Sequence, residues 1–191
     1  LVMWLETHVR IKSNTKMFCS CKNAVELALE PNINTCPVCM GFPGMIPVLN
    51  EKVVDLAVRA WLAMKCKVNE ISEFDRKSYF YPDAPNQFQI TQLYHPIVEH
   101  WKINVLINGE LKEFRIHRMH IENDVWKLVH AWSKTLCDYN RSGSPLMEII
   151  TEPDFHSKED VIEYLMELQK IMRFCWASDA DMELGQLRCD V

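Results

Sequence analysis

Apolar and polar side chains alternate from residue 5 to residue 12, near the start of the chain. A period of two predicts a half-buried β-strand, with Leu5 and the other apolar residues on its core side. The same alternation places Glu6 and His8 next to each other on the opposite face. Arg10 and Lys12 follow on that face, where a purely solvated surface is the alternative interpretation.

Four later segments also predict strands. Residues 103–107 and 111–118 flank Asn108-Gly109, the dipeptide typical of a type I′ turn, and therefore predict a β-hairpin. The apolar run over residues 146–151 predicts a buried strand. Residues 186–190 predict a further strand, and because the chain ends within that pattern we expect it to be part of a longer protein.

Two segments with a period near 3.6 predict helices. The first follows Asn50, a residue suited to an N-cap, and the second, longer helix follows Ser157. We expect their apolar stripes to pack against a sheet. These stripes are Val53, Val54, Ala57, Val58, Trp61 and Leu62 in the first helix, and Val161, Ile162, Leu165, Leu168, Ile171, Met172 and Cys175 in the second.

The segment from residue 73 to residue 92 mixes aromatic side chains with basic and amide groups. This composition is typical of a loop that stacks on or grips a ligand. The candidate contacts are Arg76, Lys77, Tyr81 and Gln89. A loop whose aromatic residues only anchor it to the core is the alternative.

Four of the eight cysteines form two close pairs, Cys19-Ser-Cys21 and Cys36-Pro-Val-Cys39. Two such pairs joined by a loop can bring four thiolates around one tetrahedral Zn²⁺. Free or disulfide-bonded thiols are the alternative. We expect a structural zinc-binding lobe at residues 19–39, because four Cys ligands leave no open coordination position.

These elements predict an α+β fold with a mixed, mainly antiparallel sheet, flanking helices and the small zinc-binding lobe. The chain has 191 residues, of which 48% are hydrophobic, enough for one domain with a sizeable core. It contains no membrane-length apolar run and no signal-peptide pattern, and its eight cysteines indicate a reducing, cytoplasmic environment. A net charge of −5 argues against a broad phosphate-binding surface, although not against a local nucleic-acid contact.

The stretch His120-Ile-Glu-Asn-Asp124, followed by Lys127, gathers an imidazole, two carboxylates and an ammonium group. Such a set suits a hard divalent cation that holds a phosphorylated substrate, and a solvated acidic turn is the alternative. Glu148 lies within an apolar run, where an ionised carboxylate requires a cation or a proton. A salt bridge to Arg141 is the alternative there. Together with the acid–histidine pair of the first strand, these residues predict one shared site.

Eight stretches, in order along the chain, resemble the motifs of one protein family. They are Leu5-Glu-Thr-His8, Phe18-Cys-Ser-Cys21, Cys36-Pro-Val-Cys-Met-Gly-Phe-Pro-Gly44, Phe74-Asp-Arg-Lys77, Tyr79-Phe-Tyr-Pro-Asp83, Asp138-Tyr-Asn-Arg-Ser-Gly143, Leu146-Met-Glu-Ile-Ile-Thr-Glu-Pro-Asp154 and Leu187-Arg-Cys-Asp190. The family is that of the B subunits of the bacterial glutamyl/aspartyl-tRNA amidotransferases, which are similar to the E subunits of the archaeal enzymes. The resemblance implies that residues 1–191 are the N-terminal catalytic cradle domain, truncated at the C-terminal side.

The resemblance further implies a two-step reaction. ATP phosphorylates the side-chain carboxylate of glutamate or aspartate mischarged on tRNA(Gln) or tRNA(Asn), and ammonia then displaces the phosphate to leave the amide. The implied cofactors are ATP, Mg²⁺ and Zn²⁺. The implied partners are mischarged tRNA and the other members of a heterotrimer, namely an amidase that releases ammonia from glutamine (the A subunit) and a small C subunit. A non-catalytic, zinc-stabilised module that binds tRNA or partner subunits is the alternative.

By position, the resemblance assigns His8, Glu122 and Glu148 to magnesium. We further expect Glu6, Asp124, Lys127 and Asp190 as catalytic residues, and Arg76, Lys77, Tyr81, Gln89 and Arg141 at the substrate or ammonia entry. The chain departs from the usual family pattern in two places. Asn123 stands where Glu is usual, and Asn86-Gln87-Phe88 stands where Lys-Gly-Tyr is usual.

The chain has 6 Trp and 5 Gly, whereas an average usage of about 7% predicts about 13 Gly. All six tryptophans fall where the resembled family has Gly, namely at Trp4, Trp61, Trp101, Trp126, Trp132 and Trp176. We therefore hypothesise that the gene encodes these glycines by UGA and that UGA was read as Trp. Six independent substitutions are the alternative. With Trp present we expect a damaged site, because Trp4 and Trp126 flank the candidate ligands.

Overall fold

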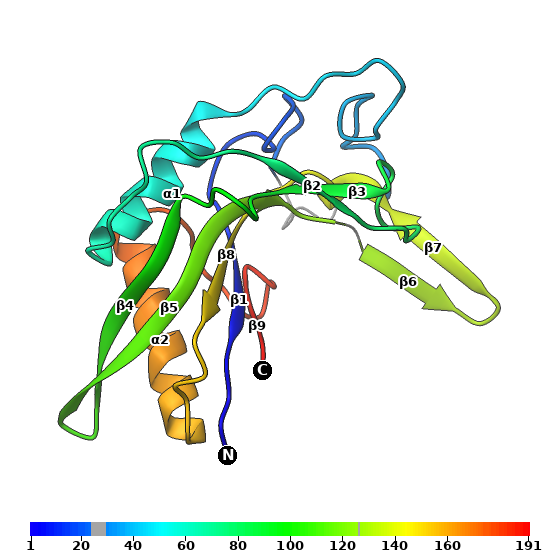
Figure 1. The fold of residues 1–191 in the computed structure, drawn as a ribbon. Helices are drawn as coiled ribbons and strands as arrows, with labels where there is room; N and C mark the ends of the chain where they lie inside the picture. Colours follow the sequence, from blue (N-terminus) through cyan, green and yellow to red (C-terminus); the bar gives the residue numbers. More distant parts are fainter. Residues whose placement is uncertain (24–29, 126) are drawn as a thin grey trace.

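The structure is a computed structural model that describes residues 1–23, 30–125 and 127–191. Its main element is a five-stranded sheet with the strand order β4-β5-β8-β1-β9 (Figure 1). The strands are β1 (Glu6–Arg10), β4 (Val98–Ile107), β5 (Glu110–Asn123), β8 (Pro145–Thr151) and β9 (Leu187–Asp190). Among the described strands every pairing is antiparallel, which confirms the predicted α+β class with a mainly antiparallel sheet.

Two α-helices, α1 (Glu51–Ala63) and α2 (Lys158–Phe174), cover one face of this sheet (Figure 1). Asn50 caps α1 by accepting a backbone hydrogen bond at 2.9 Å, and Ser157 forms a capping box with Asp160 at the start of α2. Buried apolar residues from both helices and from the strands form one continuous core. Within the described residues, no helix combines the length and the apolar character needed to cross a membrane.

The predicted apolar stripes of the two helices have the correct spacing, but they include some exposed residues and omit some buried ones. Leu62 and Ile162, which were expected to be buried, are 58% and 50% exposed. Leu56, Ala60 and Tyr164 lie outside the predicted stripes and are buried instead. Because α2 lies on β4 and α1 packs beside α2, tertiary packing rather than the apolar pattern sets the buried faces.

The predicted β-hairpin is confirmed, and its second strand continues to Asn123. Asn108 and Gly109 have φ values of 52° and 85°, as a type I′ turn requires. A further hairpin, formed by β6 (Lys127–Ala131) and β7 (Lys134–Asp138), projects away from the sheet (Figure 1). Both hairpins are local in sequence, so their turns set their strand registers.

The segment expected to be a ligand-gripping loop contains a two-stranded ribbon that flanks a loop at residues 79–87, and its contact with a ligand stays a prediction. The strands β2 (Asp75–Ser78) and β3 (Phe88–Thr91) pair antiparallel. The ribbon is docked on the end of β5: Gln89 Nε2 donates to the Asn123 carbonyl at 3.0 Å, and Ile90 N–H donates to Asn123 Oδ1 at 2.7 Å. This docking orders the segment and depends on a distant strand, which local composition does not reveal.

Two of the tryptophans occupy backbone positions that favour glycine. Trp132 has a φ of 53° and Trp176 a φ of 61°, and a residue with a Cβ is disfavoured in this left-handed region. Trp61 is completely buried, and its indole N–H has no hydrogen-bond partner among the described residues. Trp126 lies outside the described residues. The backbone conformations agree with glycine at positions 132 and 176, whereas Trp61 packs in the core within α1; the recoding hypothesis stays a prediction.

Candidate active site

Glu148 lies at the centre of a row of side chains that crosses the sheet. The central strand β8 pairs with β1 on one side and with β5 on the other, and the register sets Glu148 opposite both His8 and His120. Residues directly opposite each other in antiparallel strands point to the same face. Glu148 Oε2 consequently lies 3.5 Å from Nε2 of His8 and 3.5 Å from Nε2 of His120.

Glu122 and Glu6 join this row from positions two residues along their strands, on the same face. The two oxygens of Glu122 lie 3.6 Å from His8 Nε2 and 3.7 Å from His120 Nε2, and Glu6 Oε1 lies 3.7 Å from His8 Nε2. The ligand atoms of Glu6, His8 and Glu148 are within 4.8 Å of one another, as are those of His120, Glu122 and Glu148. We call these five residues the histidine–carboxylate cluster.

Burial and proximity shift the pKa values within the cluster. Burial alone lowers the pKa of His8, but hydrogen bonds to Glu122 and Glu148 raise it to about 10. Burial raises the pKa of Glu148, but hydrogen bonds from His120 and His8 outweigh it and hold that pKa below its usual range. Burial and the neighbouring charge of Glu148 raise the pKa of Glu6. Without an ion, the carboxylates at the centre are therefore neutralised by imidazolium protons.

The chemistry of these donors fits a divalent cation. Glu122 and Glu148 are 2% and 6% exposed, and buried carboxylates require a counter-charge. Carboxylate oxygens are preferred ligands of Mg²⁺, and a metal ion can replace the imidazolium protons. Thr91 Oγ1 donates to Glu122 Oε2 at 3.2 Å and so orients one of the ligands. Within the described residues, the buried Nδ1 of His120 has no partner.

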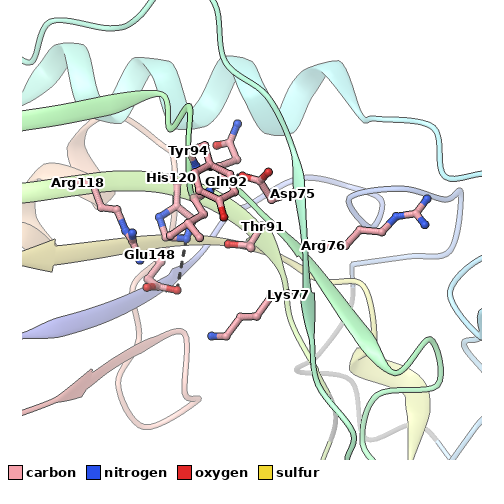
Figure 2. A pocket seen from close by; sticks show the side chains of 10 residues that line it. Asp75, Arg76, Lys77, Thr91, Gln92, Tyr94, Arg118, His120 and Glu148 are labelled. Carbon is pink, nitrogen blue, oxygen red and sulfur yellow. Dashed lines mark hydrogen bonds and ion pairs between the residues drawn. The ribbon is translucent and has the colours of Figure 1, made fainter.

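The cluster opens into a cleft of about 310 Å³ between the sheet and the β2–β3 ribbon (Figure 2). Arg118, His120 and Glu148 line the cleft from the sheet, and Lys77 lines it from the ribbon. Figure 2 shows Lys77 directed toward Glu148, whereas Arg76 extends the other way. Basic side chains on both walls, with an acidic cluster at the base, suit an anionic ligand that is bound together with a cation.

The four predicted zinc ligands also come together. Their sulfur atoms lie within 4.8 Å of one another, in a cluster made of Cys19, Cys21, Cys36 and Cys39. Lys16 is fully buried beside them and donates to Cys39 Sγ at 3.7 Å and to the Asn34 carbonyl at 2.8 Å. A buried ammonium group requires a nearby negative charge, which a zinc ion with four thiolates supplies. A hydrogen bond from Cys19, assisted by Lys16, lowers the pKa of Cys39 to about 5.

Comparison with known proteins identifies the family. Residues 1–191 match the GatB/GatE catalytic domain. The chain belongs to this family. It is 50% identical over 190 residues to the B subunit of the aspartyl/glutamyl-tRNA(Asn/Gln) amidotransferase of Persephonella marina, and 47% identical over 190 residues to that of Clostridium tetani. These matches cover 100% and 99% of this chain but 40% and 39% of the relatives, so the chain spans about 40% of their length.

In this GatB/GatE family member, Asp124 lies beside the cluster rather than within it. Its buried carboxylate pairs with Arg141 Nε at 3.1 Å and with Arg188 Nη2 at 3.3 Å. Arg141 therefore has a structural role in holding Asp124, whatever else it contacts. Glu148 pairs with two imidazoles, which favours the cation interpretation over the salt bridge to Arg141.

The other predicted residues lie at different distances from the cluster. Asp190 is opposite Glu6 in the register of β9 and β1 and so shares its face of the sheet. Gln89 is buried and docks the ribbon on β5. Tyr81 is 62% exposed and is not among the described residues that line the cleft. Lys127 begins β6, but its side chain lies outside what the structure describes.

Sequence reasoning missed two arginines and left one histidine unassigned. His120 belongs to the predicted motif without a role there, Arg118 lines the cleft, and Arg188 lies opposite His8. A signal for two of them was present, because Arg118, His120 and Glu122 alternate along β5 with the period of a strand. Arg188 had the same signal, because it alternates with Asp190 along the predicted strand.

Proposed function

We propose that the chain is the catalytic part of a tRNA-dependent amidotransferase, a carbon–nitrogen ligase that uses glutamine as amido donor. Its substrate is the side-chain carboxylate of glutamate or aspartate mischarged on tRNA(Gln) or tRNA(Asn), which is phosphorylated by ATP and then amidated. The names of its relatives support the tRNA amidation. The observation that carries the phosphorylation step is Glu148 buried between His8 and His120 at the base of the cleft.

Both steps are nucleophilic substitutions, each with one attacking group and one leaving group. In the first, a carboxylate oxygen of the substrate attacks the γ-phosphorus of ATP and ADP leaves. In the second, ammonia attacks the carbonyl carbon of the acyl phosphate, loses a proton, and inorganic phosphate leaves. Phosphorylation is needed because the carboxylate oxygen is otherwise a poor leaving group.

Some residues of the site bind the magnesium ion, and others bind the phosphate groups and compensate their charge. His8, Glu122 and Glu148 hold the magnesium ion, which neutralises charge on the transferring phosphoryl group when it is bound. Lys77 on the ribbon and Arg118 on the sheet both line the cleft and orient phosphate oxygens by charge-assisted hydrogen bonds. The further catalytic residues are Glu6, Asp124, Lys127 and Asp190, and the entry for substrate or ammonia is formed by Arg76, Lys77, Tyr81, Gln89 and Arg141.

The proposal extends to cofactors and partners. Zinc bound by the four cysteines stabilises the lobe at residues 19–39, which is inserted in the catalytic domain of residues 1–191. Ammonia comes from an amidase, the A subunit of a heterotrimer that also contains a small C subunit. The proposal places the protein in the cytoplasm, where charged tRNA serves translation.

Turnover by the assembled enzyme tests the proposal. The full-length protein with its partner subunits, Mg²⁺ and mischarged tRNA is expected to hydrolyse ATP and to form the amide. Glu122→Gln and Glu148→Gln each lower this turnover about 10²- to 10³-fold, because each removes a charge that compensates the transition state. Glu110→Gln is the matched control, since Glu110 is exposed at the start of β5, does not line the cleft, and its change is expected to leave turnover unaltered.

The opposite outcome supports the alternative. If the complex folds and binds tRNA, but turnover is absent or insensitive to both changes, the phosphorylation site is wrong. The chain then acts as a zinc-stabilised module that binds tRNA or partner subunits.

A further inference from the structure

We propose that His100, His117 and Glu152 form a second site for a divalent transition metal, which we call the rim site. It lies where β4 and β5 pass the end of β8, and it shares no residue with the histidine–carboxylate cluster or with the described lining of the cleft. The rim site is independent of the proposed function.

The three side chains already have the spacing of a ligand set. His117 Nδ1 lies 3.1 Å from Glu152 Oε1, and the rings of His100 and His117 have centroids 5.6 Å apart with an interplanar angle of 89°. One ligand atom from each residue lies within 4.8 Å of the other two. Small side-chain rotations are enough to bring three such atoms to bonds of about 2.0–2.2 Å from one ion.

The backbone presents both histidines from paired strands and Glu152 from the residue directly after β8. His100 and His117 face each other between the pairs Glu99–Arg118 and Trp101–Ile116 of β4 and β5. His100 has a φ of 49°, and the register of β5 against β8 shifts between Ile116 and Arg118, where His117 lies. A histidine in the left-handed region is strained, and such strain often accompanies ligand sites.

The surroundings leave room for an ion and neutralise the nearby cations. His100 and Glu152 line a cavity of about 350 Å³, so water can complete the coordination. Arg115 is engaged by Asp154 through a hydrogen bond of 2.9 Å, and Lys102 Nζ by Glu113 at 2.7 Å. Neither cation therefore needs the Glu152 carboxylate as its counter-charge.

The donor set selects the class of metal. Two imidazoles with one carboxylate favour Zn²⁺ and related transition metals over Mg²⁺, which prefers oxygen ligands. Three protein ligands leave a fourth position open in a tetrahedral site, unlike the four cysteines. The bound ion would link β4, β5 and the segment after β8.

Calorimetric titration with Zn²⁺ tests the rim site. The full-length protein, carrying its cysteine-bound zinc, is titrated beside His100→Asn, His117→Asn and Glu152→Gln, so that Zn²⁺ bound at the histidine–carboxylate cluster is common to all four proteins. We expect the unaltered protein to bind one more Zn²⁺ than these variants, or to bind it about 10- to 100-fold more tightly. His130→Asn is the matched control, because His130 is an exposed strand histidine whose hydrogen-bond partner is Thr135.

The choice of Asn and a second measurement distinguish a loss of metal binding from a loss of folding. Asn tolerates the left-handed backbone of position 100, so His100→Asn is expected to keep the fold. Added Zn²⁺ is expected to raise the urea midpoint of the unaltered protein and of His130→Asn by more than that of His100→Asn. Identical titrations and identical midpoints for His100→Asn and His130→Asn would overturn the rim site, whatever the result for turnover.

Discussion

The cysteine cluster and the histidine–carboxylate cluster, two candidate metal centres, are built in different ways. The cysteine cluster gathers four residues from one short segment, residues 19–39, and its spacing alone pointed to the ligands. The histidine–carboxylate cluster gathers His8, His120 and Glu148 from three strands that are far apart in sequence. A local centre depends on the motif, whereas the second centre depends on how the strands are paired.

This difference makes the second centre sensitive to strand register. Glu148 alternates with Met147 and Ile149, which are completely buried on the core side of β8. A shift of β8 by one residue would turn Glu148 into the core and bring an apolar residue into the site. The apolar side chains of the core therefore fix the geometry of the histidine–carboxylate cluster, because only one register buries them all.

Removing a zinc ligand is expected to have the largest effect on stability. Cys36→Ser leaves three thiolates beside the buried Lys16 and lowers the free energy of unfolding by about 4 kcal/mol, with loss of bound zinc. Urea unfolding and metal analysis measure both quantities. Cys137→Ser, outside the cluster, keeps zinc and stability. Equal zinc content in both variants would show that the cysteines do not bind zinc.

A change at His120 tests whether this residue belongs to the same metal site as the rest of the histidine–carboxylate cluster. His120→Asn removes the contact with Glu122 and Glu148, and it is expected to weaken Mg²⁺ binding about 10- to 100-fold. Calorimetry on the full-length protein measures the affinity, with His130→Asn as control. If Mg²⁺ binds equally to both variants, His120 does not belong to the metal site.

The proton on His8 predicts a pH dependence of Mg²⁺ binding. The pKa of His8 is raised from 6.5 to about 10, so its stabilising charge is fully present below pH 6.5 and is lost as the pH rises through about 10. Because Mg²⁺ displaces this proton, its affinity is expected to rise between these values by up to about tenfold per pH unit. Titrations in buffers of different ionisation enthalpy measure the released proton. A Mg²⁺ affinity that does not depend on pH would contradict this account. So would a pH dependence that is the same in His8→Asn.

The smallest effect concerns a backbone position remote from both centres. Trp176 follows the C-cap of α2 with a φ of 61°, and its N–H donates to the Arg173 carbonyl while Ala177 N–H donates to that of Met172. Helices usually place Gly there, so Trp176→Gly is expected to stabilise the protein by about 1 kcal/mol.

Trp176→Ala separates backbone strain from the loss of the large side chain. Alanine keeps the Cβ, so it is expected to give little or none of the gain, and thermal unfolding of both variants measures the difference. Equal stabilities for the two variants would show that backbone strain at position 176 is not the cause of the gain. Mass spectrometry of the native protein tests the recoding itself, because Trp at the six positions excludes glycine there.

Much of the architecture could be read from local patterns. The type I′ turn at Asn108 and Gly109, the caps at Asn50 and Ser157, and the buried strand around Glu148 were all predicted and are confirmed. The β2–β3 ribbon was missed because Asn123, on a distant strand, provides the hydrogen bonds that dock it. The exposed Leu62 and Ile162 were misjudged because neighbouring elements, not the helix itself, decide which apolar residues are covered.

The sequence by itself determined the chemical types at the two centres and the family. It identified the four cysteines and the acid–histidine pairs, and its motifs indicated the family that the match over residues 1–191 confirms. Only the tertiary structure decided that Glu148 lies between His8 and His120, that Asp124 is held by Arg141 and Arg188, and that His100, His117 and Glu152 meet. The physical reason is that residue types and short spacings are local properties, whereas contacts between strands depend on a register that the whole core selects.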